Sequence, residues 1–125
     1  MNMLIYNLAF SPKIKLLDLS GNRSTNADTA EALYELLKIS GAIETLVMQN
    51  TGVSKFLTED FFKALGENKT LVYLNLDETE GVNGKEILMA KAIAMNAYKN
   101  GSLEGVSIVN WIANSSFAHQ FIEYL

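Results

Sequence analysis

Apolar residues recur along the chain in a phrase of fixed spacing, Leu-x-x-Leu-x-Leu-x-x-Asn, in which Ile, Val or Met can replace Leu and Thr can replace Asn. Four copies have their apolar residues at 14, 17 and 19, at 43, 46 and 48, at 71, 74 and 76, and at 103, 106 and 108. The copies start at Ile14, Ile43, Leu71 and Leu103, so the first two intervals are nearly equal and the third is longer. Self-similarity at a period in the range of about 20–50 residues predicts a solenoid of stacked supersecondary units.

Side chains of a β-strand point alternately to its two faces, so the phrase also predicts which residues face the core. Its Leu positions would point inward, and the positions between them would point outward. We expect short strands near residues 15–19, 44–48, 72–76 and 104–108. The predicted fold class is α/β, with four parallel strands alternating with helices in a right-handed arc.

The segments between these strands carry apolar residues at helical spacing. Before the third strand these residues are Phe61, Phe62 and Leu65. The equivalent positions are Leu33, Tyr34 and Leu37 in the preceding repeat, Ile93, Ala94 and Ala97 in the following repeat, and Leu4, Ile5 and Leu8 in the opening segment. We therefore expect a helix before every strand, including one at the start of the chain.

Polar residues and glycines predict where these helices begin and end. Capping-box spacing occurs at Asp28 with Glu31 and at Asn83 with Glu86, and Thr58 can cap the helix that follows it. Gly41, Gly66 and Gly101 follow the last apolar turns. Each is expected to close its helix in a left-handed conformation.

The two ends of the chain differ from the internal repeats. The opening helix has no strand before it, and Phe117, Phe121 and Leu125 have the spacing of a further helix after the last strand. Terminal repeats lack a neighbour on one side, so these helices are either caps or parts of a longer array. We expect residues 1–125 to form a single domain with four strands and a helix at each end.

The clearest repeat is the stretch Gly66-Glu67-Asn68-Lys69-Thr70-Leu71-Val72-Tyr73-Leu74-Asn75-Leu76, which holds a helix end, an Asn and the Leu-x-x-Leu-x-Leu run. With this period and a full helix in each unit, residues 4–111 resemble leucine-rich repeats of the ribonuclease-inhibitor type. The resemblance implies a leucine-rich-repeat solenoid that binds other proteins, a family in which catalytic activity is rare.

The repeat order is also similar to the C-terminal domain of the tropomodulins, which cap the slow-growing end of actin filaments. This similarity is carried by residues 21–28 after the first strand and by the stretched third repeat, where we expect an extra turn at residues 80–84. Actin capping is the function that this second resemblance implies.

A partner would meet the outward strand positions, which line the concave surface of the arc. The candidate binding residues there are Leu16, Asp18, Thr45, Val47, Gln49, Tyr73, Asn75 and Asp77. Two Asp and no basic residue make this surface mildly acidic. Tyr73 is its one large aromatic residue, and it is either an interface anchor or an exposed residue with high β-propensity.

Two further features depart from the repeat. Trp111 takes the Asn position of the fourth phrase and cannot accept a hydrogen bond there. We expect it to pack against the C-terminal helix and shield the last repeat, rather than to be an exposed anchor. The loop of residues 77–84 carries three carboxylates but lacks calcium-loop spacing, so we expect a solvated acidic loop.

Charge and composition exclude several classes of partner. The net charge is −4, and the 10 Lys and Arg residues are scattered. Surfaces for nucleic acid or anionic membranes need clustered basic residues, so we expect neither partner. Cysteine is absent, which fits a reducing compartment. We expect a cytoplasmic protein with no signal peptide and no membrane span.

The sequence contains few residues suited to catalysis. The single histidine is His119, near the end of the chain, and no carboxylates cluster at ligand spacing. We predict no enzyme, no cofactor and no metal. The predicted function is a non-catalytic scaffold that binds a protein partner through the concave strand face and the adjacent loops. The alternatives are a tropomodulin-like actin-capping domain and a structural spacer within a larger protein.

Overall fold

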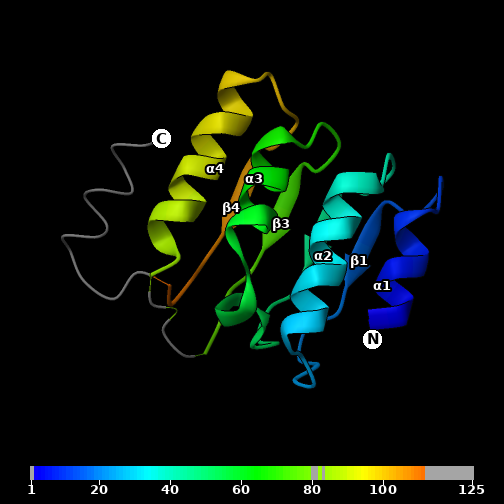
Figure 1. Cartoon of the computed structure of the whole chain (residues 1–125), viewed down its shortest axis with the longest axis vertical. Helices are drawn as coiled ribbons and strands as arrows, with labels where there is room; N and C mark the ends of the chain where they lie inside the picture. Colours follow the sequence, from blue (N-terminus) through cyan, green and yellow to red (C-terminus); the bar gives the residue numbers. More distant parts are fainter. Residues whose placement is uncertain (1, 80–81, 83, 112–125) are drawn as a thin grey trace.

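Four short parallel strands form the sheet of the computed structural model, which describes residues 2–79, 82 and 84–111 (Figure 1). They are β1 (Leu16–Asp18), β2 (Thr45–Val47), β3 (Tyr73–Asn75) and β4 (Gly105–Ser107), and they lie side by side in sequence order. Each lies inside the range that the repeated phrase predicts. The expected α/β class with four parallel strands is confirmed.

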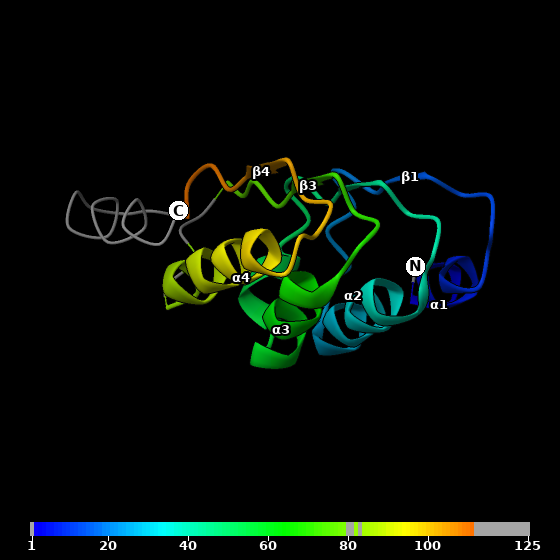
Figure 2. The same cartoon turned by 90° about the horizontal axis from the view of Figure 1, so that it is seen from above.

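A helix precedes each strand. The helices are α1 (Asn2–Ala9), α2 (Ala27–Ile39), α3 (Glu59–Glu67) and α4 (Glu86–Tyr98), and a 3-10 turn, η1 (Val53–Phe56), lies between β2 and α3. Figure 2 shows all four α-helices on one side of the sheet, so the described chain has two layers. Helix α1 confirms the expected opening helix. The helix expected around Phe117, Phe121 and Leu125 lies outside the described residues.

The register of the sheet aligns the four copies of the phrase. Neighbours across adjacent strands are the central apolar positions Leu17, Leu46, Leu74 and Val106. Backbone hydrogen bonds continue the ladder past the strand ends, as from Leu76 N–H to Ser107 O at 2.9 Å. Equivalent residues of successive repeats therefore lie next to one another on both faces of the sheet.

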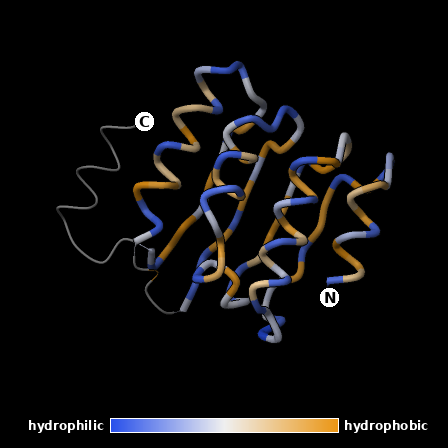
Figure 3. The backbone as a smooth tube through the Cα atoms, viewed as in Figure 1, coloured by the Kyte–Doolittle hydropathy of each residue, from blue (hydrophilic) through white to orange (hydrophobic). Residues whose placement is uncertain are grey.

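The inner face of the sheet packs on the helices through the Leu positions of the phrase. In the two middle repeats these side chains are at most 1 % exposed: Ile43, Leu46, Met48, Leu71, Leu74 and Leu76. The end positions Ile14, Leu103 and Ile108 are only partly buried. Figure 3 shows hydrophobic residues alternating with hydrophilic ones along each helix, as expected for helices with one buried side.

A series of polar side chains closes the connections from helices to strands. Ser11, Ser40 and Asn68 each accept hydrogen bonds from the backbone amides two and three residues later, at 2.7–3.3 Å. Asn96 has the same role and accepts from Leu103 N–H at 3.1 Å. Because Ser11 follows α1, this helix ends in the same way as the internal helices.

Two of these residues also join neighbouring repeats. The Asn68 side-chain amide donates to Leu37 O at 2.8 Å, and that of Asn96 donates to Leu65 O at 2.9 Å. Both acceptors are carbonyls at the end of the preceding helix, where intrahelical partners run out. The two buried Asn side chains therefore satisfy the backbone and fix the stacking of the helices.

The long spacing of the third repeat has a different origin from the one expected. Asn68 and Asn96, which close equivalent helix ends, are 28 apart in the sequence, whereas Asp77 and Val109, which are bonded across the sheet, are 32 apart. The additional residues therefore follow Asn96, at the end of α4. The extra turn expected at residues 80–84 falls mostly outside the described residues. Because the additional residues follow Asn96, Met89 and Ala90, not Ile93 and Ala94, take the buried positions that Phe61 and Phe62 hold in α3.

The helix starts also differ from the expected caps. Helix α2 has Asn26 as its N-cap, and Asn26 Oδ1 accepts from Thr29 N–H at 3.1 Å while Thr29 Oγ1 accepts from Asn26 N–H at 3.1 Å. The capping box predicted at Asp28 and Glu31 is therefore wrong. Thr58 is the N-cap of α3 without a side-chain bond. Asn83 lies outside the described residues, and Lys85 is the N-cap of α4.

The expected left-handed glycines at the helix ends are wrong as well. Gly41, Gly66 and Gly101 all lack a positive φ. Two of them are instead required by close packing. A Cβ on Gly66 would lie 2.6 Å from Met95 Sδ, and a Cβ on Gly101 would lie 2.3 Å from Asn96 Oδ1. These glycines allow α3 to approach α4 and leave room for the Asn96 amide.

Candidate functional site

The open face of the sheet, on the side away from the helices, carries the outward strand positions. The strand register sets out two rows: Leu16, Thr45, Tyr73 and Gly105, then Asp18, Val47, Asn75 and Ser107. A third row continues past the strand ends with Ser20, Gln49, Asp77 and Val109. Within the described chain no helix covers this face (Figure 2). All eight candidate binding residues lie on it.

Three apolar side chains are prominent on the open face. Leu16 is 61 % exposed, Tyr73 is 37 % exposed and Val109 is 58 % exposed. Asp18 is also exposed, and the half-buried residues are Thr45, Val47, Gln49 and Asp77. Asn75 is buried, with 9 % exposure. Val109 was not among the candidate residues, although its place two residues after Ser107 marks it as outward.

The Tyr73 ring lies over the neighbouring strand. A Cβ on Gly105 would lie 3.1 Å from Tyr73 Cδ1, so the ring occupies the space that a side chain on β4 would fill. The ring also runs along its own strand, because Asn75 Nδ2 lies 3.4 Å from the Tyr73 hydroxyl oxygen and donates to it. Gly105 thus leaves space for the ring, and the Asn75 amide bonds to its hydroxyl.

The two aspartates of the open face are held by local hydrogen bonds. Asp77 Oδ1 accepts from Ser107 Oγ at 2.6 Å and from Val109 N–H at 2.7 Å, which fixes the carboxylate across the sheet. Asp18 Oδ1 accepts from the Ser20 hydroxyl at 2.6 Å and from the Ser20 amide at 2.9 Å. These bonds, chiefly the one from the hydroxyl, lower the pKa of the Asp18 carboxyl below its ordinary value. Asp18 is therefore charged at neutral pH.

The loop after β3 is not the fully solvated acidic loop that the sequence predicts. Glu78 is only 5 % exposed, and its two carboxylate oxygens accept from Gly52 N–H at 3.0 Å and Ser54 N–H at 3.1 Å. Both donors lie at the start of η1, where backbone amides lack intrahelical partners. Glu78 thus joins the second and third repeats. Glu80, the remaining carboxylate of this loop, lies outside the described residues.

Trp111 is buried behind the last strand. Its side chain has 0 % exposure, its ring lies edge-on to Phe62 at a centroid distance of 6.4 Å, and its Nε1 donates to Leu76 O at 2.8 Å. In the earlier repeats, Asn22 and Thr51 donate instead to the carbonyl three residues before them. The indole therefore replaces a bond within the turn by a bond to the preceding repeat. The C-terminal helix expected to cover it lies outside the described residues.

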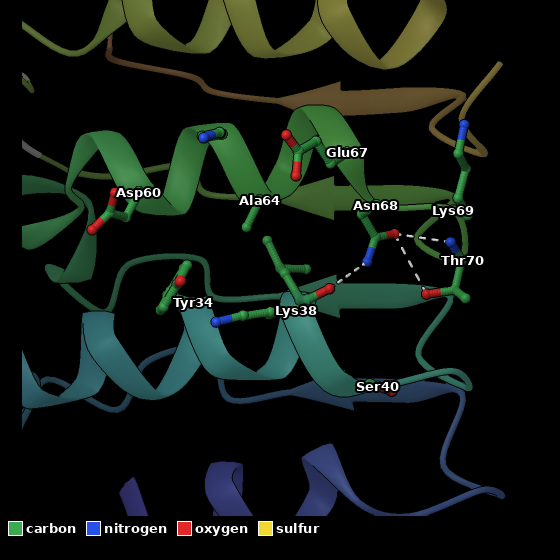
Figure 4. Close-up of a pocket in the computed structure, with 11 residues that line it drawn as sticks. Tyr34, Lys38, Ser40, Asp60, Ala64, Glu67, Asn68, Lys69 and Thr70 are labelled. Atoms are coloured by element: carbon green, nitrogen blue, oxygen red, sulfur yellow. Dashed lines mark hydrogen bonds between the residues drawn. The ribbon is translucent and has the colours of Figure 1, made fainter. Parts of the chain in front are cut away.

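A groove of ≈ 530 Å³ lies between α2 and α3 on the helical side. Figure 4 shows Tyr34 and Lys38 on one wall and Asp60, Ala64 and Glu67 on the other. The charges of the groove are mixed, and its two buried polar residues, Ser40 and Asn68, are already bonded to backbone groups. The groove is a seam between two repeats. The sequence offered no signal for it.

Metal-binding groups do not gather in the described chain. No group of three or more His, Cys, Asp or Glu within residues 2–79, 82 and 84–111 could hold a metal ion. His119 lies outside these residues. That the chain is not an enzyme stays a prediction from the sequence. Of the helices that the structure describes, none is both long and apolar enough to cross a membrane.

The parallel sheet, the helices on one side and the repeated apolar phrase together define a fold of the leucine-rich-repeat type. Among solved structures, the chain is similar to the C-terminal domain of tropomodulin from Caenorhabditis elegans, with a TM-score of 0.56 and 19 % sequence identity. The match covers 99 % of this chain and 90 % of that chain. At this identity the likeness shows a shared fold only. The sequence matches no protein-family model and no curated protein.

Proposed function

We propose that this chain is a ribonuclease-inhibitor-type repeat scaffold that binds a protein partner through its open face. The observation that carries the proposal is the presence of three exposed apolar side chains on that face, Leu16, Tyr73 and Val109. They lie on the strands of one sheet or their continuation, so they are presented at fixed spacing. Leucine-rich-repeat domains generally use such a surface for protein partners.

The physical character of the face supports this proposal. Large aromatic side chains are enriched among the residues that dominate interface energetics, and the Tyr73 ring lies over Gly105 and accepts a hydrogen bond from Asn75. A side chain that is already ordered loses little conformational entropy when a partner binds. The surrounding outward positions are mostly small, which leaves room for a partner to approach the backbone.

Site-specific photo-crosslinking tests which face binds. A photoreactive benzoylphenylalanine is placed at Val47 on the open face, or at the exposed Lys63 of α3 as the matched control on the helical side. After irradiation in an extract of the source cells, we expect a discrete protein adduct from position 47 and none from position 63. Adducts from position 63 alone would assign binding to the helices and contradict the proposal.

Two alternatives predict different outcomes. An actin-capping role is favoured by the structural likeness to a tropomodulin domain along 99 % of this chain. Unchanged elongation of actin filaments from their slow-growing ends, in the presence of saturating protein, would remove that role. A structural spacer predicts no discrete adduct from position 47 or position 63.

A further inference from the structure

Resting on the proposed open-face binding, we propose that this face receives an arginine side chain of the protein partner between the ring of Tyr73 and the carboxylate of Asp77. The two groups come from the same outward side of β3 and its continuation, with Asn75 between them. The partner segment would present a basic, planar side chain among apolar residues.

The ring offers a face to such a side chain. Gly105 lies under one edge of the Tyr73 ring, and Asn75 donates to the hydroxyl at its tip. The ring therefore extends along the sheet toward Asn75, in the direction of Asp77, and 37 % of the residue stays accessible. An accessible aromatic face attracts a cation, and arginine is the cation found there most often.

The Asp77 carboxylate is fixed on the same face, four residues after Tyr73 along the chain. Ser107 Oγ and Val109 N–H both donate to Asp77 Oδ1, at 2.6 and 2.7 Å. In the described chain no donor is bonded to Oδ2, so this oxygen can still accept a hydrogen bond. Asp77 is also linked to the ring through Asn75, whose Oδ1 accepts from Asp77 N–H at 2.9 Å. One polar network thus orients both receiving groups.

The open face carries negative charges without basic side chains beside them. The three outward rows contain Asp18 and Asp77 and no Lys or Arg. The ion pairs of the described chain join Lys15 to Glu44 at 3.8 Å and Lys99 to Glu67 at 3.6 Å, so they neutralise neither aspartate. A positively charged partner would meet a negative, partly apolar surface, and complementary charge favours both encounter and orientation.

Arginine fits this arrangement better than lysine. Its planar guanidinium can stack on an aromatic ring while its N–H groups reach a carboxylate, whereas the lysine ammonium is a compact, strongly hydrated charge. The exposed Val109 beside Asp77 offers apolar contact to the aliphatic part of the side chain.

The probe is the acetylated, amidated peptide Leu-Arg-Val-Arg-Leu, titrated to millimolar concentration into the isotope-labelled full chain and followed by amide NMR shifts. We expect saturable shifts at Gly105, Ser107 and Val109, weaker binding when Lys replaces Arg, and no saturable shifts when Glu replaces Arg. Asp77→Asn keeps the accepting oxygen and removes the charge, and Tyr73→Leu keeps apolar bulk. Each should weaken binding by about fivefold.

The matched controls lie on the helical side: Asp60→Asn and Tyr34→Leu should leave the peptide affinity unchanged. Arginine-peptide shifts confined to the groove between α2 and α3, equal binding of the glutamate peptide, or full affinity in Asp77→Asn would overturn the inference. If the partner is crosslinked at Val47 while the arginine peptide moves none of these resonances, the proposed function stands and this inference fails. If crosslinking at Val47 also fails, both are wrong.

Discussion

Replacing Leu74 by alanine lowers the free energy of unfolding by about 2–5 kcal/mol. Leu74 is 0 % exposed at the centre of β3, between Leu46 and Val106 in the register of the sheet. Truncation removes apolar contacts and leaves a cavity that neighbours on both sides prevent from closing. Leu46→Ala should lower the free energy of unfolding by a similar amount, because Leu46 is the equivalent residue of β2 and is also 0 % exposed.

Urea denaturation followed by circular dichroism measures this effect. The matched control is Leu16→Ala, which removes the same side chain from the same sheet at a position that is 61 % exposed. We expect the control to change stability by less than about 0.5 kcal/mol. A loss of less than about 1 kcal/mol for Leu74→Ala would mean that the assigned inward face is wrong.

Replacing Trp111 by alanine should lower the free energy of unfolding by about 3–5 kcal/mol. The indole is fully buried, contacts Phe62 and supplies the donor to Leu76 O. The change therefore removes apolar packing and one of the two hydrogen bonds to Leu76 O, the other coming from Ser54 Oγ at 3.4 Å. Because this residue joins the third and fourth repeats, the loss should fall on the last repeat first.

A second variant separates packing from hydrogen bonding. Trp111→Phe keeps an aromatic ring against Phe62 but removes the donor, and should cost about 1–3 kcal/mol. Hydrogen exchange of the β4 amides, compared with those of β2, measures where the loss falls. Equal stability of the Phe and Ala variants would show that the hydrogen bond, and not the packing, carries the effect. Protection that falls first in β2 would contradict the assigned contacts.

The strands could be predicted because a parallel sheet repeats one simple rule. The inward-facing strand residues Leu46 and Leu74 are both apolar and both fully buried, so the repeat period of the sequence matches the repeat period of the structure. The outward positions follow from the alternation of side chains along a strand, so the sequence alone places Tyr73 and Asp77 on one face.

The helix ends could not be predicted in the same way, because several polar residues compete for each cap. Asn26 and Asp28 are both good N-caps, and only the packing of α2 decides between them. The length of the third repeat showed that residues were added but not where. The bond that Leu103 N–H donates to Asn96 Oδ1, which no local pattern reveals, shows that the added residues follow α4.

The candidate site was only partly accessible to sequence reasoning. The identity of the outward residues follows from spacing, but their orientation depends on neighbours in other repeats. Gly105 has no side chain where the Tyr73 ring lies, and the Ser107 hydroxyl donates a hydrogen bond to the Asp77 carboxylate. The burial of Glu78 could not be predicted either, because a charged residue in a loop is normally solvated. Its carboxylate is buried because the backbone amides of Gly52 and Ser54, in the preceding repeat, donate to it.

The most direct test of open-face binding is the affinity of the crosslinked partner for paired double variants. Tyr73→Ala with Asp77→Ala alters the open face, and Tyr34→Ala with Asp60→Ala makes the matched change on the helical side. With the far-UV circular dichroism of both variants unchanged, binding measured by calorimetry should weaken at least about tenfold for the first pair, since interface anchors typically contribute more than about 1 kcal/mol each. The second pair should bind as the unaltered chain does. Unchanged affinity of the Tyr73 and Asp77 variant would contradict open-face binding.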